Sequence, residues 1–476
     1  MKNWNPQRVA AAAGARLIEE GRTDGGGPSR VVVDSRAVAP GDLFVGLVGA
    51  SADGGGFASD ALAAGALGVL AGAEHVEHAA HAAEVEHPGH SGQRGNAEDL
   101  ERARRGGGVL IASDDPLAAL GQLAREWRRE LGARVVAITG SSGKTSTKDI
   151  LAALLTPALE TFASPSNHNT EIGLPLAILA APRGTRALVL ELAMRGAGQI
   201  AELTEICEPD VGVVVNVGPA HLELLGTLEA IAAAKGELLE GLRDGATAVV
   251  PAGEPLLERF LRPSLEAVTF GPGGDVALLA AGPAGVSVSL GGRRVELEPG
   301  FRAGHLLVDL CAALAAAHAL GVTPARGPLS VRFSALRGER LELPGGVVVV
   351  NDCYNANPMS MRAALDELAL TAAGRRVAVL GDMLELGERD ERRYHRELGE
   401  QARAAGVSLL VTVGTRAAWA GESFALAAGD AEHLHADDAS AAAELLRSRL
   451  HAGDTVLVKG SRAVALERVA ADLAAR

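Results

Sequence analysis

The strongest constraint on the fold is a glycine-rich turn between a strand-like run and a helix-like run. Five apolar or β-branched residues, 135–139, lead into Gly-Ser-Ser-Gly-Lys-Thr-Ser-Thr at 140–147. Such a turn places backbone N–H groups at the positive end of a helix, where they bind an anion. Ile138 stands at the first glycine position of the standard spacing, so the loop is a variant. We predict nucleotide phosphate binding by Gly140, Ser141, Ser142, Gly143, Lys144, Thr145 and Ser146.

Length and charge limit the class of protein. The chain has 476 residues, with 45 Lys and Arg against 59 Asp and Glu and a net charge of −14. This length suits about three domains. The acidic balance excludes a protein that mainly grips a nucleic-acid backbone. No run approaches about 18 apolar residues, no secretory signal opens the chain, and the three cysteines lack CxxC spacing. We expect a cytoplasmic protein with reduced thiols and no membrane insertion.

Strand-like runs alternate with helix-length segments, which predicts the α/β class with mostly parallel sheets. We expect three domains, at residues 1–117, 118–325 and 326–476. The expected strands are 31–33, 43–47, 68–70, 135–139, 187–191, 211–217, 247–251, 347–350, 376–380, 409–413 and 455–459.

The segment 72–108 has a different composition, rich in His, Glu, Gly and Arg and poor in large apolar residues. Because it offers little to bury, we expect a flexible surface insertion within the first domain. Its histidines, at positions 75, 78, 81, 87 and 90, include a set spaced about one helical turn apart, which could share a transition-metal ion. A solvated, His-rich insertion is the favoured interpretation.

Three further residues stand where a nucleotide site needs them. Glu191 ends a buried-type strand, where a carboxylate can hold Mg²⁺ beside the nucleotide. Asn216 and His221 follow the next strand, and ligands of open α/β sheets bind at the carboxyl ends of strands. Lys235 lies among alanines on a helix-like run, and residue pattern alone favours a surface lysine there.

Together these motifs resemble the Mur ligases of peptidoglycan synthesis. The resemblance lies in the phosphate loop 139–145, the Asn-x-Asn segment 167–175, the Asn-x-Gly-x-x-His segment 216–221 and the segment 234–237. It implies a small N-terminal α/β uridine-nucleotide-binding domain, a central P-loop ATPase domain and a C-terminal Rossmann-like α/β domain. It further implies ATP, two Mg²⁺ sites and a carbamylated Lys235. The implied metal ligands are Thr145, Glu191, His221 and Lys235.

Segments 351–361, 381–387 and 457–462 resemble one subgroup of that family. This resemblance implies a ligase that joins D-alanyl-D-alanine to UDP-N-acetylmuramoyl-tripeptide through an acyl phosphate. Separately, we expect a monomer, although the sequence leaves the oligomeric state open. Three residues depart from the usual pattern: Asn351 replaces Asp, Cys353 replaces Ser and Leu306 replaces Asn.

The resemblance also assigns roles to individual residues. The implied catalytic residues are Lys144, His221, Lys235 and Arg340, with Arg340 reaching the γ-phosphate. Asp352 and Asn355 join the phosphate loop in binding ATP. The implied substrate-binding residues are Ser35, Arg36, Phe44, Asn167, Asn169, Thr170, Asn357, Lys459 and Arg462.

Two alternatives compete with this interpretation. One is a sibling Mur or polyglutamate-type ligase that adds a single amino acid; the motifs at 354–358 and 381–387 argue against it. The other is a P-loop nucleotide-binding regulator without ligation. A GTPase of that kind carries an Asn-Lys-x-Asp base-recognition motif, and this sequence has none.

Overall fold

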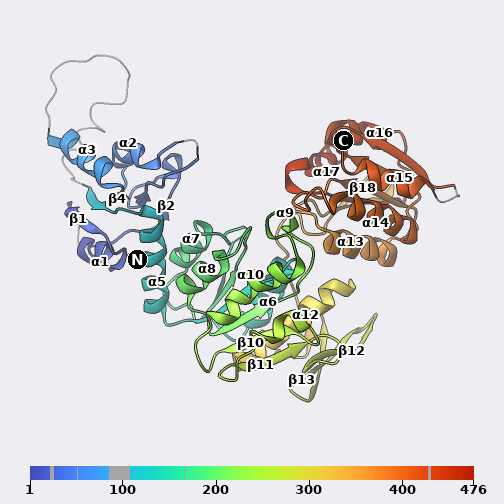
Figure 1. The fold of residues 1–476 in the computed structure, drawn as a ribbon, viewed down its shortest axis with the longest axis horizontal. Helices are drawn as coiled ribbons and strands as arrows, with labels where there is room; N and C mark the ends of the chain where they lie inside the picture. Colours follow the sequence, from blue (N-terminus) through green and yellow to red (C-terminus); the bar gives the residue numbers. More distant parts are fainter. Residues whose placement is uncertain (22–25, 51, 85–107, 166, 427–429, 476) are drawn as a thin grey trace, which may run out of the picture. The chain divides into compact units, whose positions relative to one another are not determined.

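The computed structural model describes residues 1–21, 26–50, 52–84, 108–165, 167–426 and 430–475. Within these ranges the chain forms three sheets that are mostly parallel, with helices packed on them, so the predicted α/β class is confirmed (Figure 1). The chain divides into two compact units. The first comprises residues 1–135, 159–192 and 202–208, and the second comprises 136–158, 193–201 and 209–476.

Hydropathy and cysteine environment bear on two of the sequence predictions. None of the described helices combines the length and the hydropathy that a bilayer span requires. Cys207, Cys311 and Cys353 are buried free thiols, as their spacing predicted.

The first unit contains a five-stranded sheet in the order β1-β5-β4-β3-β2, parallel except for β1. In the same unit, β7 pairs in parallel with β8. Its elements are α1 (Pro6–Ala12), β1 (Arg16–Glu19), β2 (Val31–Val32), η1 (Ser35–Ala37), β3 (Leu43–Val45), η2 (Gly54–Phe57), α2 (Ala58–Ala63), β4 (Gly68–Ala71), α3 (Ala73–Glu84), β5 (Val109–Ala112), α5 (Pro116–Leu131), β7 (Thr161–Ala163), α7 (Gly173–Ala180), β8 (Ala187–Glu191) and most of α8 (Gln199–Cys207).

Helix α3 occupies the start of the segment that was expected to be a flexible insertion. Val76 and Ala79, one helical turn apart, are buried in a core with Phe44 and Val69. This spacing gives the helix one apolar side, which the histidines and glutamates between those residues obscured in the sequence. Residues 73–80 therefore belong to the folded unit. The remainder of the expected insertion, 85–107, lies outside the described residues.

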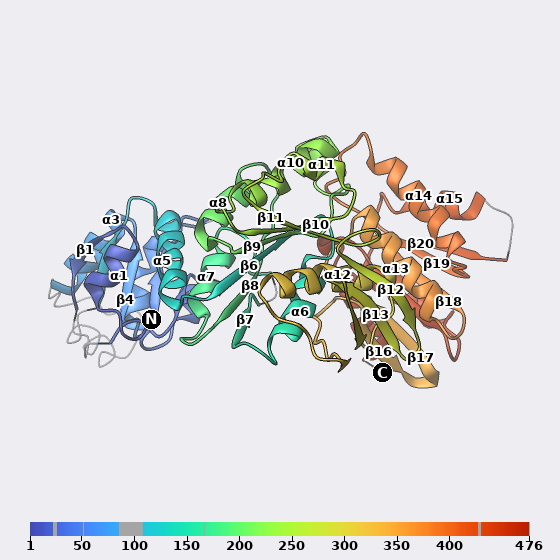
Figure 2. The same ribbon diagram turned by 90° about the horizontal axis from the view of Figure 1, so that it is seen from below.

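In the second unit, the central sheet follows the order β15-β14-β13-β12-β11-β10-β9-β6. Helices α6 and α12 pack together on one face, whereas α10 and α11 form a core with β9 and β10 on the other (Figure 2). Strands β12, β13 and β14 form an antiparallel meander that the sequence analysis did not anticipate. The elements are β6 (Arg134–Thr139), α6 (Lys144–Leu155), β9 (Val211–Val214), α9 (Leu222–Leu225), α10 (Leu228–Glu240), β10 (Thr247–Pro251), α11 (Pro255–Glu258), β11 (Glu266–Phe270), β12 (Val276–Gly282), β13 (Gly285–Leu290), β14 (Arg293–Glu298), α12 (Gly304–Ala319) and β15 (Gly327–Pro328).

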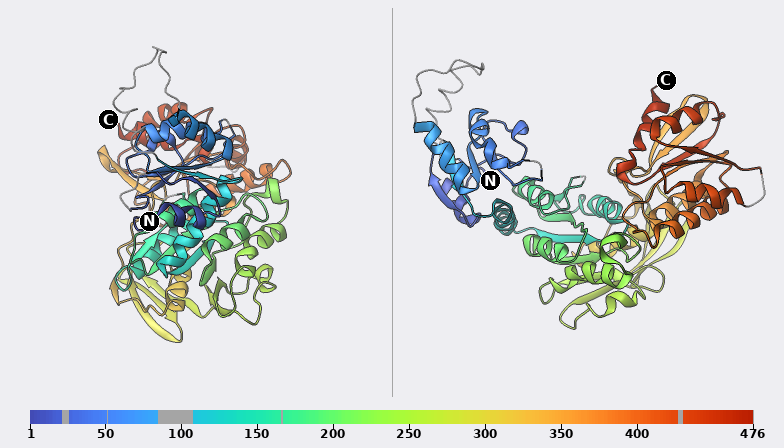
Figure 3. Two further views of the ribbon diagram at one scale, coloured as in Figure 1. Left: turned by 90° about the vertical axis from the view of Figure 1, so that its left-hand side faces the viewer. Right: turned by 45° about the horizontal axis from the view of Figure 1, so that its top comes forward.

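The C-terminal part of the second unit is a six-stranded sheet in the order β16-β17-β21-β18-β19-β20, parallel except for β16. Helices α16 and α17 pack against its buried valines and leucines, and Figure 3 shows helices on both faces of this sheet, coloured orange to red. The elements are β16 (Glu339–Leu343), η3 (Pro344–Gly346), β17 (Val347–Asn351), α13 (Pro358–Thr371), β18 (Arg376–Gly381), α14 (Glu391–Ala404), β19 (Leu409–Val413), α15 (Ala418–Leu426), β20 (Glu432–Ala436), α16 (Ala439–Arg447), β21 (Thr455–Lys459), η4 (Arg462–Val464) and α17 (Glu467–Ala474).

Parallel pairing brings the predicted motifs to the carboxyl ends of neighbouring strands. In the central sheet, the loops 140–143 and 215–221 follow the paired strands β6 and β9. In the C-terminal sheet, the segments after β17, β18 and β21 begin side by side because β21 pairs with both of the others. These are the edges at which open α/β sheets bind ligands.

Candidate functional site

The phosphate loop connects β6 to α6, as the sequence predicted. Gly143 is the N-cap of α6, with a φ of 77° and no capping side chain. A Cβ atom at this position would lie 2.4 Å from Oδ1 of Asp309, so only glycine fits the close approach. The positive end of the helix is therefore available to an anion in the loop.

The loop after β9 holds the phosphate loop in place. The side chain of Asn216 accepts a hydrogen bond from the Ser142 N–H (3.0 Å) and donates one to the Ser142 carbonyl oxygen (3.1 Å). The Ser141 hydroxyl donates to the Gly218 carbonyl oxygen (2.9 Å) and accepts from the Gly218 N–H (3.0 Å). Each serine thus donates one hydrogen bond and accepts another, and these bonds fix the loop before any ligand binds.

Two lysines stand beside this loop in different environments. Lys144 is half-buried, and its Nζ donates to the Gly140 carbonyl oxygen (2.7 Å). Lys235, on α10, is only 1% exposed. Burial lowers the pKa of Lys235 well below its ordinary value, and the positive charge of Lys144 lowers it further. The surface-lysine interpretation of Lys235 is therefore wrong, because its run of small residues packs inside the fold.

His221 contacts a residue that the sequence analysis did not single out. Its Nδ1 lies 2.6 Å from Oε2 of Glu385, in the predicted motif 381–387. The Glu223 N–H donates to the Glu385 carbonyl oxygen (3.1 Å), so the backbone supports the same contact. The hydrogen bond from His221 lowers the pKa of the Glu385 carboxyl group. A carboxylate on one ring nitrogen orients the imidazole and directs the other nitrogen toward a ligand.

A second unpredicted carboxylate supports the start of α6. Ser146 Oγ lies 2.5 Å from Oδ2 of Asp309 on α12. Asp309 is 3% exposed, and burial raises its pKa to about 7. The sequence carried a signal for it, since Asp309 is the one charged residue in the apolar run 306–317.

The arginine nearest the loop differs from the one that the resemblance indicated. Nη2 of Arg337 donates to the Thr145 hydroxyl (3.2 Å), whereas Arg340 is exposed on β16. Arg337 was not among the predicted site residues. The reach of Arg340 to a γ-phosphate stays a prediction.

The segment after β17 lies against the phosphate loop through Asn357. Its Nδ2 donates to the Ser141 carbonyl oxygen (3.0 Å), while its Oδ1 caps α13 by accepting from the Ser360 N–H (2.9 Å). Lys459, predicted to bind substrate, is 2% exposed and bonds to Asp352 Oδ2 (2.6 Å) and to the Asn355 carbonyl oxygen (3.1 Å). Lys459 thus holds the segment that carries the predicted ATP-binding residues.

The remaining predicted residues of this segment and its neighbour are exposed. Asn355 presents its side chain at the surface beside its bond to the Ala356 N–H. Arg462 pairs with Glu467 at 3.1 Å. Both are available to a ligand, and their predicted roles stay predictions.

In the first unit, Glu191 ends β8 with a buried carboxylate. Its Oε1 accepts a hydrogen bond from Nδ2 of Asn169 (2.9 Å), which links two of the predicted residues. A carboxylate oxygen is a ligand that Mg²⁺ prefers. Asn167 and Thr170 lie on either side of Asn169 and are exposed.

The predicted uridine-nucleotide residues are less closely held. Arg36 is exposed and pairs with Asp34 at 2.8 Å, which lowers the pKa of Asp34 to about 2. Ser35 is half-buried in the same turn. Phe44 is fully buried, and its side chain packs in the core of the sheet. The substrate-binding role of Phe44 stays a prediction.

One of the predicted histidines has a defined partner. His75 Nε2 lies 2.9 Å from Oδ2 of Asp53, and with Glu74 these residues offer ligand atoms within 4.8 Å of one another. His78 is exposed on α3, and His87 and His90 lie outside the described residues.

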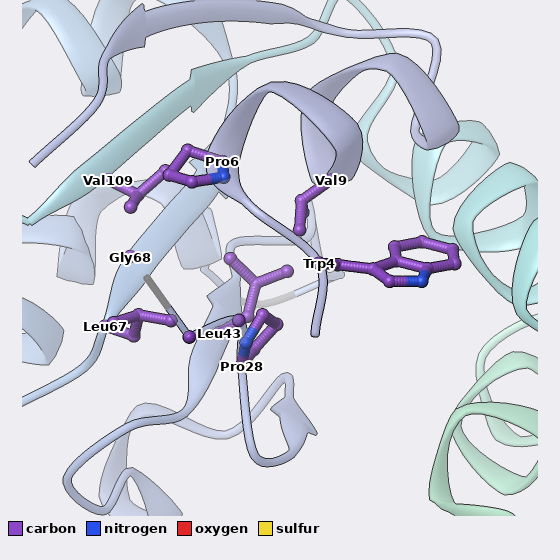
Figure 4. Close-up of a pocket in the computed structure, with 10 residues that line it drawn as sticks. Trp4, Pro6, Val9, Pro28, Leu43, Leu67, Gly68 and Val109 are labelled. Atoms are coloured by element: carbon purple, nitrogen blue, oxygen red, sulfur yellow. The ribbon is translucent and has the colours of Figure 1, made fainter. Parts of the chain in front are cut away.

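A small pocket in the first unit is apolar. Its lining includes Trp4, Pro6 and Val9 near the N-terminus, and Leu43, Leu67 and Val109 from the sheet and its loops (Figure 4). This lining offers no acid, base or nucleophile for chemistry. The candidate site is therefore the phosphate loop and the segments that bond to it.

Comparison with known proteins shows the family to which this chain is similar. The family model of the Mur ligase middle domain matches residues 138–317, and that of the Mur ligase, glutamate ligase domain matches 336–462. The UDP-N-acetylmuramoyl-tripeptide–D-alanyl-D-alanine ligase of Mycobacterium tuberculosis is 37% identical over 479 residues, covering 94% of this chain and 92% of that protein. Its counterpart in Bacillus subtilis is 34% identical over 379 residues, covering 77% and 81%.

Two solved structures are similar over most of their length. MurF from Acinetobacter baumannii matches with a TM-score of 0.80 and 27% identity, covering 99% of each chain. The MurF ligase from Thermotoga maritima, solved in complex with ADP, matches with a TM-score of 0.75 and 32% identity, covering 93% of this chain and 96% of that one.

Proposed function

Because the chain belongs to the Mur ligase family, we propose that it joins D-alanyl-D-alanine to UDP-N-acetylmuramoyl-tripeptide with ATP as the energy source. The observation that carries the proposal is the hydrogen bond from Asn357 to the Ser141 carbonyl oxygen. It connects the motif typical of one subgroup to the phosphate loop shared by the family. The names of the relatives support the same substrates. We place the reaction in the cytoplasm and assign it to a monomer.

The proposed reaction has two steps. The terminal carboxylate of the tripeptide attacks the γ-phosphorus of ATP, so that an acyl phosphate forms and ADP leaves. The amine of D-alanyl-D-alanine then attacks the acyl carbon, inorganic phosphate leaves, and the nitrogen loses a proton to give the amide. The first step brings two anions together, so neutralisation of charge is the main demand on the protein.

The residues around the phosphate loop suit that demand. Lys144 supplies a cation, and the loop N–H groups at the start of α6 bind phosphate oxygens. Asn216 and Ser141 keep the loop in its binding shape through the bonds described above.

Asp352 and Asn355 are assigned to the nucleotide and Arg340 to the γ-phosphate. Ser35 and Arg36 are assigned to the uridine nucleotide, and Asn167, Asn169 and Thr170 to the rest of the substrate.

The chemistry of the donor set fits magnesium. Thr145, Glu191 and His221 offer a hydroxyl, a carboxylate and an imidazole, which are ligand types for divalent cations. An ammonium group at Lys235 would oppose a cation, but burial favours its neutral form. Bound Mg²⁺ would neutralise phosphate charge and polarise the phosphoryl group. We assign two such sites, served by Thr145, Glu191, His221 and Lys235.

The neutral amine of Lys235 also suits carbamylation. Its nitrogen lone pair attacks the carbon of CO₂, and the nitrogen releases a proton, which leaves an anionic carbamate with two oxygen ligands. A lysine that stayed protonated could not take this step. The assignment is tested by solid-state or solution ¹³C NMR of the protein under ¹³CO₂. A carbamate signal that is absent from Lys235→Gln supports it, and identical spectra for the two proteins contradict it.

The function is tested by phosphate release and product mass. Purified protein receives Mg²⁺-ATP and UDP-N-acetylmuramoyl-tripeptide, with D-alanyl-D-alanine or a panel of single amino acids as acceptor. We expect product only with the dipeptide. Product only with a single amino acid would make the chain a sibling ligase, and nucleotide binding without product would make it a P-loop regulator.

A further inference from the structure

Arg337 belongs to a segment that is fastened to α6 and to the motif after β17. The Ser334 N–H donates to Oδ2 of Asp149 on α6 (2.8 Å). Two residues later, the Leu336 carbonyl oxygen accepts from the Tyr354 N–H (3.3 Å). Leu336 has a φ of 61°, a backbone conformation that a leucine rarely adopts. The chain thus makes an unfavourable turn immediately before Arg337, between two fixed points.

The guanidinium group of Arg337 is held on two sides. Its Nη2 donates to the Thr145 hydroxyl, and its central carbon lies 4.0 Å from the centroid of the Tyr354 ring. Stacking on an aromatic face fixes the plane of an arginine without using its hydrogen-bond donors. The orientation of the Arg337 guanidinium group is therefore set, and most of its N–H donors remain for another partner.

One of those donors is buried and has no acceptor among the described residues. Nε of Arg337 is inaccessible to solvent and makes no hydrogen bond there. A buried N–H without an acceptor is costly, and it calls for a group that the protein alone does not supply. The group must be an acceptor, must tolerate a cation and must lie beside Thr145. A nucleotide phosphate meets all three requirements.

We propose that Arg337 binds the phosphate groups of the nucleotide. When a metal cation binds the Thr145 hydroxyl oxygen, the hydrogen bond from Arg337 to that oxygen breaks. The N–H donors of Arg337 then bind phosphate oxygens, while stacking on Tyr354 keeps the plane of the guanidinium group. Arg337 then acts with Lys144 in holding the nucleotide, separately from Arg340 on β16. The proposal rests on the proposed function, since it takes the nucleotide site as its premise.

The test is calorimetric titration of the full chain with AMP-PNP, in Mg²⁺ and without substrate. We expect Arg337→Ala to weaken binding at least tenfold and Arg337→Lys to restore part of the loss, because lysine keeps the charge but loses the planar fork. Arg332→Ala, which removes an exposed arginine from the same segment, is the matched control and should stay within twofold of the wild type. Thermal unfolding of each variant establishes that it is folded.

The outcomes separate this proposal from the proposed function. Affinity of Arg337→Ala within twofold of the wild type would overturn the role of Arg337 and leave the ligase assignment intact. Equal losses in the Lys and Ala variants would also overturn it, since a purely structural role needs no charge. A wild-type protein that bound no AMP-PNP would overturn both.

Discussion

The phosphate-loop region and the N-terminal region around Arg36 hold their predicted residues in different ways. At the phosphate loop, Ser141 and Ser142 are bonded to segments 74 to 216 residues away in the sequence. Arg36 makes its ion pair with Asp34, only two residues away, and its side chain is 88% exposed. The first region is fixed by the fold, whereas the second is a surface turn with local contacts.

This contrast fits the role that we propose for each region. Phosphoryl transfer needs charges within a fraction of an ångström of fixed positions, so the groups that supply them must be held before the ligand binds. Binding of the nonreacting end of a substrate needs attraction but little geometric precision. We therefore expect substitutions at the phosphate loop to lower kcat and substitutions at Arg36 to raise KM.

Lys144→Ala should have the largest effect. It removes the cation to which we assign neutralisation of phosphate charge in the transition state, and loss of one such group typically costs about 10²–10³ in kcat. The measurement is steady-state phosphate release at saturating substrate. Lys2→Ala, at the one exposed lysine of the chain, is the matched control. A KM effect alone, with kcat retained, would contradict the distinction between the two regions.

Glu385→Ala should have an intermediate effect, on metal binding. The carboxylate orients the imidazole of His221 from a distance of 2.6 Å, and loss of such a partner typically weakens metal affinity about 10–100-fold. Titration with Mn²⁺, followed by electron paramagnetic resonance, measures this without turnover. Glu388→Ala removes an exposed acid from the same loop and serves as control. Unchanged affinity in Glu385→Ala would show that His221 needs no orienting partner.

Arg36→Ala should have a smaller effect and of a different kind. Loss of one exposed, charge-assisted contact should raise KM for the uridine-nucleotide substrate about tenfold, at most, and leave kcat within about twofold. Arg16→Ala, at another exposed arginine of the first unit, should change neither value. A fall in kcat would mean that this surface turn also positions the reacting carboxylate.

The sequence predicted what depends on neighbours along the chain and missed what depends on contacts between distant segments. Strands 187–191, 247–251, 409–413 and 455–459 have the predicted bounds, because each is a short apolar run with clear breaks. The pairing of His221 with Glu385 joins residues 164 positions apart and has no local signal. Lys235 is the clearest example, since alanines around a lysine do not reveal whether a helix is buried.

Lysine usage contained a signal that the residue pattern did not. Only five of the 45 cationic residues are lysines, and only Lys2 is exposed. Lys148, Lys235 and Lys459 are each 2% exposed or less, and Lys144 is half-buried. The exposed cations are otherwise arginines, so a lysine in this chain indicates an interior position. The antiparallel meander β12-β14 carried a signal that the prediction passed over: Val286, Val288 and Leu290 alternate with serines, and after the glycine pair 291–292 apolar and charged residues alternate again.

Asp309→Asn should have the smallest effect on turnover and should appear in stability instead. Burial raises the folded-state pKa of Asp309 to about 7, above its ordinary value of 3.8. Its carboxyl group therefore binds its proton more tightly in the folded chain, and wild-type stability falls as pH rises through this window. Asparagine keeps the shape without the charge. We expect the two proteins to have the same free energy of unfolding below pH 4. Between pH 4 and pH 7, the variant should become more stable than the wild type by up to about 1.4 kcal/mol per pH unit.

Thermal unfolding across this pH range measures the difference, with Asp366→Asn, at an exposed aspartate on α13, as the control that should show no pH-dependent gain. A constant difference at every pH would mean that Asp309 supports Ser146 by shape alone. A gain in stability confined to pH 4–7, with kcat retained, would mean that the ionised carboxyl group of Asp309 destabilises the fold. The phosphate-loop region would then tolerate this group because its side chain fits against Gly143 and Ser146. In the Arg36 region the pKa of Asp34 is lowered to about 2, so this carboxyl group should cause no loss of stability as the pH rises from 4 to 7.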